Sequence, residues 1–146
     1  LLSTHLLDRR LWWMQTDQNV NDATFALMLG VSVYVIWTYS DEPWLAILPS
    51  LFMAFGDGVT GIIRNKMFRK RTKSAWGNLG MAILCLPLGW FVGTLATPSI
   101  PLWGMISGGV ASFIERYEFG VIDDNVLIII ASSIVIFMGL ILGPII

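Results

Sequence analysis

The sequence predicts an all-α, polytopic membrane protein with about five transmembrane helices. Of its 146 residues, 55% are hydrophobic and 13% are charged, whereas about a quarter of the residues of a typical soluble domain are charged. The mean hydropathy is +0.72. The apolar residues form separate runs, most of which approach the ~20 residues that a helix needs to cross a bilayer. We therefore expect a single membrane domain over residues 1–146.

The predicted segments follow one another in a simple order. Residues 1–15 mix apolar and polar side chains and include Trp12 and Trp13, so they fit an interfacial helix or the tail of a longer one. The chain begins with Leu rather than Met, and we expect further residues upstream. After the polar stretch 16–22, apolar runs at 23–39 and 44–63 flank the short turn Asp41-Glu42-Pro43. Three more spans are predicted at 77–95, 102–114 and 126–146.

Glycines predict how these spans pack. Pairs of small residues four positions apart let membrane helices approach closely. Such pairs are Gly89 with Gly93, Gly104 with Gly108, and Gly139 with Gly143.

The distribution of charge predicts the orientation. Six of the nine Lys and Arg residues lie between positions 64 and 73, in a predicted basic loop at 64–74. The turns at 41–43 and 97–101 carry no Lys or Arg. Cytoplasmic loops are enriched in these residues, so the basic loop is expected in the cytoplasm. Alternating spans then bring 19–22, Asp57, Glu115 and 123–125 to the same face, which predicts a site there. The alternative role for the basic cluster is to anchor the protein on anionic lipid.

Asp57 is the first candidate for chemistry, because a carboxylate at membrane depth is a functional candidate by default. It is of the right type to bind Mg²⁺ together with phosphate oxygens; an Asp that only ends a helix is the alternative. Gly56, Gly58 and Gly61 match G-x-G-x-x-G. No strand is expected before them and no acid lies about 20 residues later, so a dinucleotide fingerprint is not supported. The glycines are expected instead to let backbone or a ligand approach closely.

Acidic residues at two later helix ends are further candidates. Glu115 ends the fourth predicted span, where a local ion pair with Arg116 is the alternative to a catalytic role. Asp123, Asp124 and Asn125 open the fifth span. Asp and Asn are good helix N-caps, so capping explains one of them, and the others are left to complete a metal site with Asp57 or to orient a nucleotide.

Four short motifs together resemble the dolichol kinase and phytol kinase group, part of a wider CTP-using membrane family that includes phosphatidate cytidylyltransferases. The motifs are GDGVTG at 56–61, RNKMFRKRTKSAWGNL at 64–79, IER at 114–116 and IDDN at 122–125. The resemblance covers 55–125, which we take as the catalytic region. Trp76-Gly77 stands where the family commonly has Glu-Gly, which leaves that acid without a counterpart. The Pro-Gly-His-Gly-Gly signature of the cytidylyltransferases has no counterpart either, which favours a kinase.

The resemblance implies CTP as phosphoryl donor, Mg²⁺ or another divalent cation, and a long-chain isoprenoid alcohol as acceptor. It matches Asp57, the Lys73-Ser74 pair, Glu115 and the Asp124-Asn125 pair to the motif residues of the family. We take Asp57, Lys73 and Glu115 as the catalytic candidates, and Asp57, Asp123 and Asp124 as the candidate metal ligands. The nucleotide-binding candidates are Gly56, Gly58, Gly61, Arg64, Asn65, Arg71, Lys73, Ser74, Asn78 and Asn125.

The first hypothesis is therefore a CTP-dependent kinase of a polyprenol or dolichol-like alcohol, integral to the membrane, with its site facing the cytoplasm. Phosphoryl transfer depends mainly on positioning and charge stabilisation, so no covalent nucleophile is required. The second hypothesis is cytidylyl transfer to a lipid phosphate, and the third is a non-enzymatic transporter or lipid-binding scaffold. The expected partners are CTP, the lipid alcohol and the bilayer. No nucleic acid is expected, and a homo-oligomer is compatible with the sequence.

Overall fold

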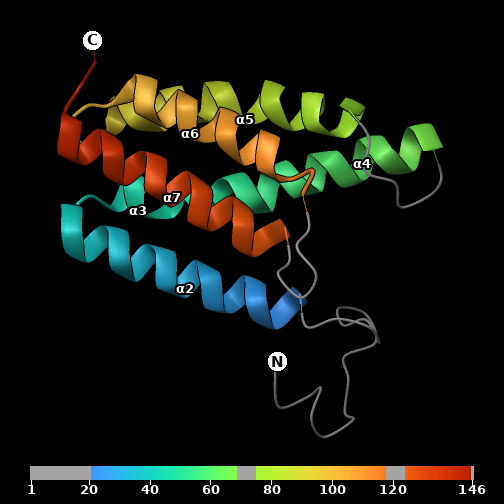
Figure 1. Cartoon of the computed structure of the whole chain (residues 1–146), viewed down its shortest axis with the longest axis horizontal. Coiled ribbons are helices and arrows are strands. Elements are labelled where there is room, and N and C mark those ends of the chain that lie inside the picture. The colour runs from blue at the N-terminus through green and yellow to red at the C-terminus, as the bar shows by residue number, and fades with distance from the viewer. Residues whose placement is uncertain (1–20, 69–74, 118–123, 146) are drawn as a thin grey trace, which may run out of the picture.

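The computed structural model describes residues 21–68, 75–117 and 124–145, without the side chains of 21–23, 57, 64–65 and 67–68. Every secondary-structure element among the described residues is a helix, as predicted, and the helices lie roughly along one another (Figure 1). In order they are α2 (Asn21–Ser40), α3 (Pro43–Leu51), η1 (Phe52–Gly56), α4 (Asp57–Phe68), α5 (Ala75–Leu95), α6 (Pro101–Ile114) and α7 (Asp124–Leu142).

Three of the helical stretches are long and apolar enough to cross a membrane, namely Pro43–Ile63, Ala75–Leu95 and Asp124–Leu142. Two shorter apolar helices accompany them, Thr24–Ser40 and Pro101–Ile114. The five predicted spans thus all form helices, and the protein is an all-α membrane protein. Large apolar side chains on the outside of the bundle, such as Tyr34 and Ile83, are exposed, as lipid-facing residues must be.

The second span differs most from its prediction. It runs as one helical stretch from Pro43 to Phe68, with a π-helical turn, η1, in the middle. The predicted loop at 64–74 is therefore wrong for residues 64–68, which continue α4. The π turn follows Pro49, which lies inside α3 and cannot donate a backbone hydrogen bond. The fifth span ends at Leu142 rather than at residue 146, because Gly143 adopts a φ of 78° and stops the helix.

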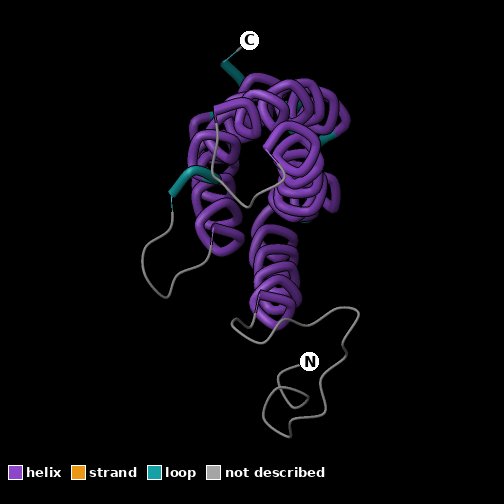
Figure 2. Tube along the Cα trace, turned by 90° about the vertical axis from the view of Figure 1, so that its right-hand side faces the viewer, coloured by secondary structure: helices purple, strands orange, loops and turns teal. Residues whose placement is uncertain are grey.

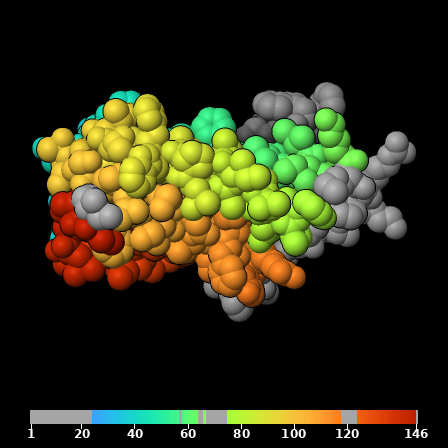
Figure 3. Space-filling view, turned by 90° about the horizontal axis from the view of Figure 1, so that it is seen from above, coloured from blue at the N-terminus to red at the C-terminus, as the bar shows by residue number. Residues whose placement is uncertain are grey.

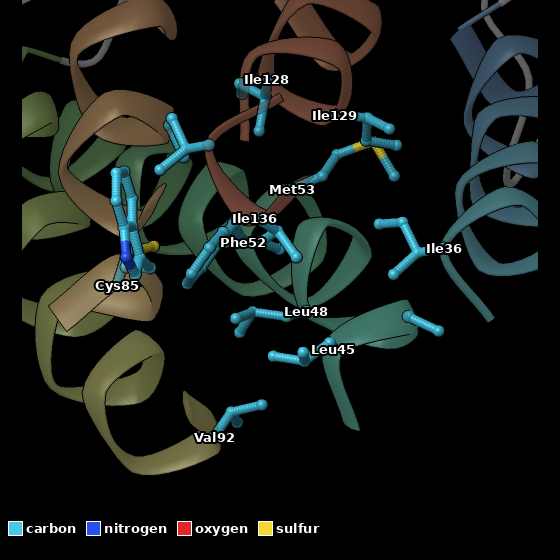
Figure 4. Close-up of a cluster of buried hydrophobic side chains, with 14 of the residues drawn as sticks. Ile36, Leu45, Leu48, Phe52, Met53, Cys85, Val92, Ile128, Ile129 and Ile136 are labelled. Atoms are coloured by element: carbon cyan, nitrogen blue, oxygen red, sulfur yellow. The ribbon is translucent and has the colours of Figure 1, made fainter. Parts of the chain in front are cut away.

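The α3–η1 segment lies at the centre of the bundle. It packs on α2, α5 and α7, and η1 also reaches α6. Figure 4 shows Leu45, Leu48 and Phe52 of this segment between side chains of the surrounding helices. The helix α2 packs chiefly on α3 and α7, and it forms one edge of the bundle (Figure 2).

Glycines bring α5 and α6 into close contact, as predicted for two of the three pairs. A Cβ atom at Gly104 would overlap the carbonyl oxygen of Gly89, and one at Gly93 would lie 2.8 Å from the carbonyl oxygen of Ile100. In the third pair, Gly139 packs against the ring of Trp103, but Gly143 has nothing within 4 Å. Gly143 is the stop of α7 instead, and its carbonyl accepts a hydrogen bond from Trp103 Nε1 at 3.0 Å.

The buried carboxylate of Glu42 links the α2–α3 connection to the α5–α6 connection, both of which lie on the left of Figure 1. Its Oε1 accepts from the backbone N–H of Trp44 at 3.3 Å and caps α3, while its Oε2 accepts from the N–H of Thr97 at 3.0 Å. The turn at 41–43 was predicted, but its role as a link to the α5–α6 turn was not.

Candidate functional site

At the other end of the bundle, the buried face of α6 finishes in a carboxylate. Gly104, Ser107, Gly108 and Ala111 are buried along this face, at intervals of three and four residues that return to the same side of a helix. Glu115 continues the series just after the last residue of α6 and is only 1% exposed. A carboxylate so far from solvent is energetically costly unless charge or hydrogen bonds compensate it, so Glu115 is a strong candidate for chemistry.

The buried face of α7 begins in a second carboxylate. Asp124 is 8% exposed and lies on the same side of the helix as Ile128, Ser132 and Ile136. Its Oδ1 accepts from the backbone N–H of Asn125 at 3.0 Å. A capping side chain accepts from the N–H two or three residues on, so this bond to the next residue does not decide the capping role that was the alternative for one of the acids at 123–125.

The helix register places these two carboxylates at the same level. Ser107 Oγ donates to the carbonyl oxygen of Ser132 at 2.9 Å, which fixes the antiparallel pairing of α6 and α7. Glu115 lies eight residues after Ser107, and Asp124 lies eight residues before Ser132. Eight helical residues rise about 12 Å, so both carboxylates lie about 12 Å from this pair, toward the same end. The structure thus places Glu115 and Asp124 at the same end of the bundle.

The first turn of α5 joins this end of α6 through a reciprocal pair of hydrogen bonds. Asn78 Nδ2 donates to the carbonyl oxygen of Ser112 at 3.1 Å, and Ser112 Oγ donates to the carbonyl oxygen of Asn78 at 2.7 Å. Each side chain thus satisfies the backbone of the other helix. Asn78 was predicted to bind nucleotide, and its Oδ1 is buried without a hydrogen-bond donor in the part of the chain that the structure describes.

The start of α4 lies beside α5 at this end (Figure 3). Thr60 is fully buried, and its Oγ1 donates to the carbonyl oxygen of Gly56 at 2.9 Å and to that of Gly77 at 3.4 Å. Asp57 is the first residue of α4 and follows the π turn directly. Turns of π helix occur often at functional sites, so the backbone around Asp57 has the irregularity expected of such a site.

The three glycines around Asp57 have different surroundings. A Cβ atom at Gly56 would lie 2.6 Å from the side chain of Met81, so this glycine does allow a close approach, by α5. Gly58 and Gly61 have nothing within 4 Å. Neither is therefore needed for packing within the described chain, and any close approach to them comes from outside it.

Several predicted site residues lie outside the described residues. These are Arg71, Lys73, Ser74 and Asp123, together with the side chains of Asp57, Arg64 and Asn65. The described residues contain no group of three or more His, Cys, Asp or Glu side chains placed to hold a metal ion. Of the predicted metal ligands Asp57, Asp123 and Asp124, the side chains of Asp57 and Asp123 lie outside the described part of the structure.

Sequence reasoning missed Thr60 and Ser112, which tie α4 to α5 and α5 to α6 at this end. One signal was available for Ser112, since it precedes Glu115 by three residues and so shares a helix face with it. Glu42 was also predicted only as part of a turn, although a carboxylate just before Pro43 is a recognisable signal for the N-terminal cap of a helix.

Comparison with known protein families, with curated proteins and with solved structures gave no match to this chain.

Proposed function

We propose that the protein is a CTP-dependent kinase that phosphorylates a membrane isoprenoid alcohol, of the polyprenol or dolichol type, at the cytoplasmic face. One observation carries the proposal most: Glu115 and Asp124, both buried, lie at one level of the bundle, at the end where α5 begins. Placing two carboxylates in an apolar bundle costs free energy, and a role in binding a metal–nucleotide complex would explain why the protein has them there. The ordered motifs from GDGVTG to IDDN add the resemblance to lipid-alcohol kinases.

The oxygen ligands available here suit the proposed chemistry. Carboxylate and amide oxygens are the protein ligands that Mg²⁺ takes beside phosphate oxygens, and Asp57, Asp124 and Asn125 supply both kinds. A bound divalent cation would neutralise charge on the nucleotide phosphates. Lys73 and Arg71 of the basic segment are assigned to the same task on the transferred phosphate, Lys as a point charge and Arg through paired hydrogen bonds.

A lipid acceptor fits the surroundings of the site. Phe55 and Ile62 on η1 and α4, and Phe113 on α6, are more than half exposed. Exposed apolar residues beside buried polar ones let an alcohol remain in the bilayer while its hydroxyl reaches the phosphate. The nucleotide would come from the aqueous side, where the basic segment raises the local concentration of anions.

The matched substitutions Asp57→Asn and Asp41→Asn test the proposal. Both exchange a carboxylate for an amide of the same size, but Asp41 lies in the α2–α3 turn at the opposite end, with a φ of 55° that Asn accepts readily. Transfer of phosphate from CTP to a polyprenol is measured for purified protein in detergent with Mg²⁺. We expect Asp57→Asn to lose at least about 100-fold in rate, as for loss of a major charge-stabilising group, and Asp41→Asn to retain the wild-type rate. Equal rates for the two variants would contradict the role of Asp57.

A further inference from the structure

Two neighbouring residues at the start of α5 hold the helices on either side of it. The backbone carbonyl of Gly77 accepts a hydrogen bond from the Thr60 hydroxyl of α4 at 3.4 Å. Asn78 exchanges two hydrogen bonds with Ser112 of α6, at 3.1 and 2.7 Å. Thr60, Gly77, Asn78 and Ser112 therefore form one hydrogen-bonded connection from α4 through α5 to α6, the polar link.

The polar link lies within one helical turn of two candidate acids. Asp57 is three residues before Thr60 in α4, and Glu115 is three residues after Ser112 at the end of α6. Three helical residues rise about 4.5 Å, so each acid lies close, along its helix, to the point where that helix is bonded to α5. The polar link therefore sets the spacing of the two backbones that carry these acids.

Thr60 also bonds within its own helical stretch, across Asp57. Its hydroxyl has one hydrogen, which it shares between the carbonyl of Gly77 and that of Gly56, the latter at 2.9 Å. Gly56 is the last residue of the π turn and immediately precedes Asp57. The same buried hydroxyl thus holds the backbone around Asp57 and fixes its position against α5.

Apolar packing alone would fix this end of the bundle less precisely. Farther along α5, close backbone contacts set its distance to α6, since a Cβ atom at Gly108 would overlap the carbonyl oxygen of Cys85. Nearer the candidate site, the hydrogen bonds of Asn78 and Ser112 replace these contacts. Hydrogen bonds weaken steeply when their geometry is bent, whereas hydrophobic attraction has no direction. The polar link therefore specifies the register and rotation of the helices where the acids need a defined spacing.

We propose that Thr60 and Ser112 are positioning residues for phosphate transfer, because their hydroxyls hold the part of α4 that carries Asp57 and the part of α6 that carries Glu115 at a fixed spacing on α5. Their effect on transfer rests on the proposed function, whereas the fixed spacing does not. Neither hydroxyl needs to touch the nucleotide or the lipid. A displacement of about 1 Å caused by a substitution far from the reacting groups can lower a rate on the order of 100-fold.

The first measurement is the rate of phosphate transfer from CTP to a polyprenol by purified variants in detergent with Mg²⁺. Thr60→Val keeps the shape of the side chain and removes its hydroxyl, and Ser112→Ala removes the other hydroxyl. We expect each substitution to lower kcat on the order of 10- to 100-fold. The KM for CTP should stay within about twofold of the wild-type value, because neither residue contributes to binding in the ground state. Thr60→Ser keeps the hydroxyl and should retain most of the wild-type kcat.

Ser32→Ala is the matched control. It is the same exchange as Ser112→Ala, and it also removes a buried hydrogen bond between two helices, that between Ser32 Oγ and Ser50 Oγ at 3.1 Å. This bond joins α2 to α3 and lies outside the polar link, so kcat should equal that of the wild type. A loss of kcat in Ser32→Ala as large as that in Ser112→Ala would contradict the proposal, because general loosening of the bundle would then explain both.

Amide hydrogen exchange, measured by mass spectrometry without nucleotide or lipid, tests the fixed spacing separately from activity. Thr60→Val should exchange faster than the wild type at 57–62, and Ser112→Ala should exchange faster at 112–116, whereas Ser32→Ala should not exchange faster at either segment. The inference is wrong if both variants exchange as the wild type does, or if exchange is faster while kcat is unaltered. Faster exchange in a protein whose wild type transfers no phosphate would support the fixed spacing and reject the proposed function.

Discussion

Gly104→Ala adds only one methyl group, but it should destabilise the bundle strongly. The α-carbons of Gly104 and Gly89 face each other across the α5–α6 contact, and a Cβ atom on either would overlap the carbonyl oxygen of the other. Backbone cannot rotate out of the way as a long side chain can, so the two helices must move apart. Overpacking of a tight interior typically costs about 1–3 kcal/mol, and we expect the upper part of this range here.

Gly30→Ala is the matched control. Gly30 lies inside α2 with nothing within 4 Å of an added Cβ atom, so the substitution creates no clash. Ala is favoured over Gly in a helix by about 0.5–1 kcal/mol, and the variant should be slightly more stable than the wild type. The two identical substitutions are thus expected to change the free energy of unfolding in opposite directions.

Thermal unfolding in detergent measures both variants through the single cysteine, Cys85. A thiol-reactive fluorophore that labels this residue only on unfolding reports the transition temperature. Gly104→Ala should unfold several degrees below the wild type, and Gly30→Ala should unfold at the same temperature or above it. A Gly104→Ala transition equal to that of the wild type would refute the close α5–α6 contact, and an equal loss in both variants would refute the explanation by overlap.

Two further predictions concern buried groups away from the candidate site. Glu42→Ala removes the cap of α3 and the link to Thr97, so it should cost about 1–2 kcal/mol in unfolding free energy, measured by the same thermal assay; a change below about 0.3 kcal/mol would contradict the link. Cys85 should resist a membrane-permeant maleimide in the folded protein and react fully after denaturation, because it is completely buried; rapid labelling of the folded protein would show that α5 and α6 separate.

The helices could be predicted from the sequence because a bilayer leaves few alternatives. An apolar run must satisfy its backbone hydrogen bonds internally, so its type follows from its length and its polar flanks. The turn at 41–43 and the start of α6 at Pro101 were predicted within a residue for this reason. The continuation of α4 to Phe68 was not, because a cluster of Lys and Arg resembles a solvated loop by charge while those residues have good helix propensity.

The candidate site could be predicted only in part. Glu115 and Asp124 stand out in the sequence as rare acids at helix ends, and the structure buries both at one level. The reciprocal bonds of Asn78 and Ser112 depend on the rotation of α5 against α6, which the glycine contacts fix and which composition does not reveal. The π turn before Asp57 has no sequence signal beyond the preceding Pro49.

The most direct test of the proposed activity follows two labels of CTP. The purified protein is incubated in detergent with Mg²⁺, a polyprenol and a lipid phosphate, and with CTP labelled at either the γ or the α phosphate. The proposed kinase transfers the γ label to the polyprenol and leaves the α label in solution. Transfer of the α label to the lipid phosphate would show a cytidylyltransferase, and no transfer of either label by folded protein would contradict an enzymatic role for the site.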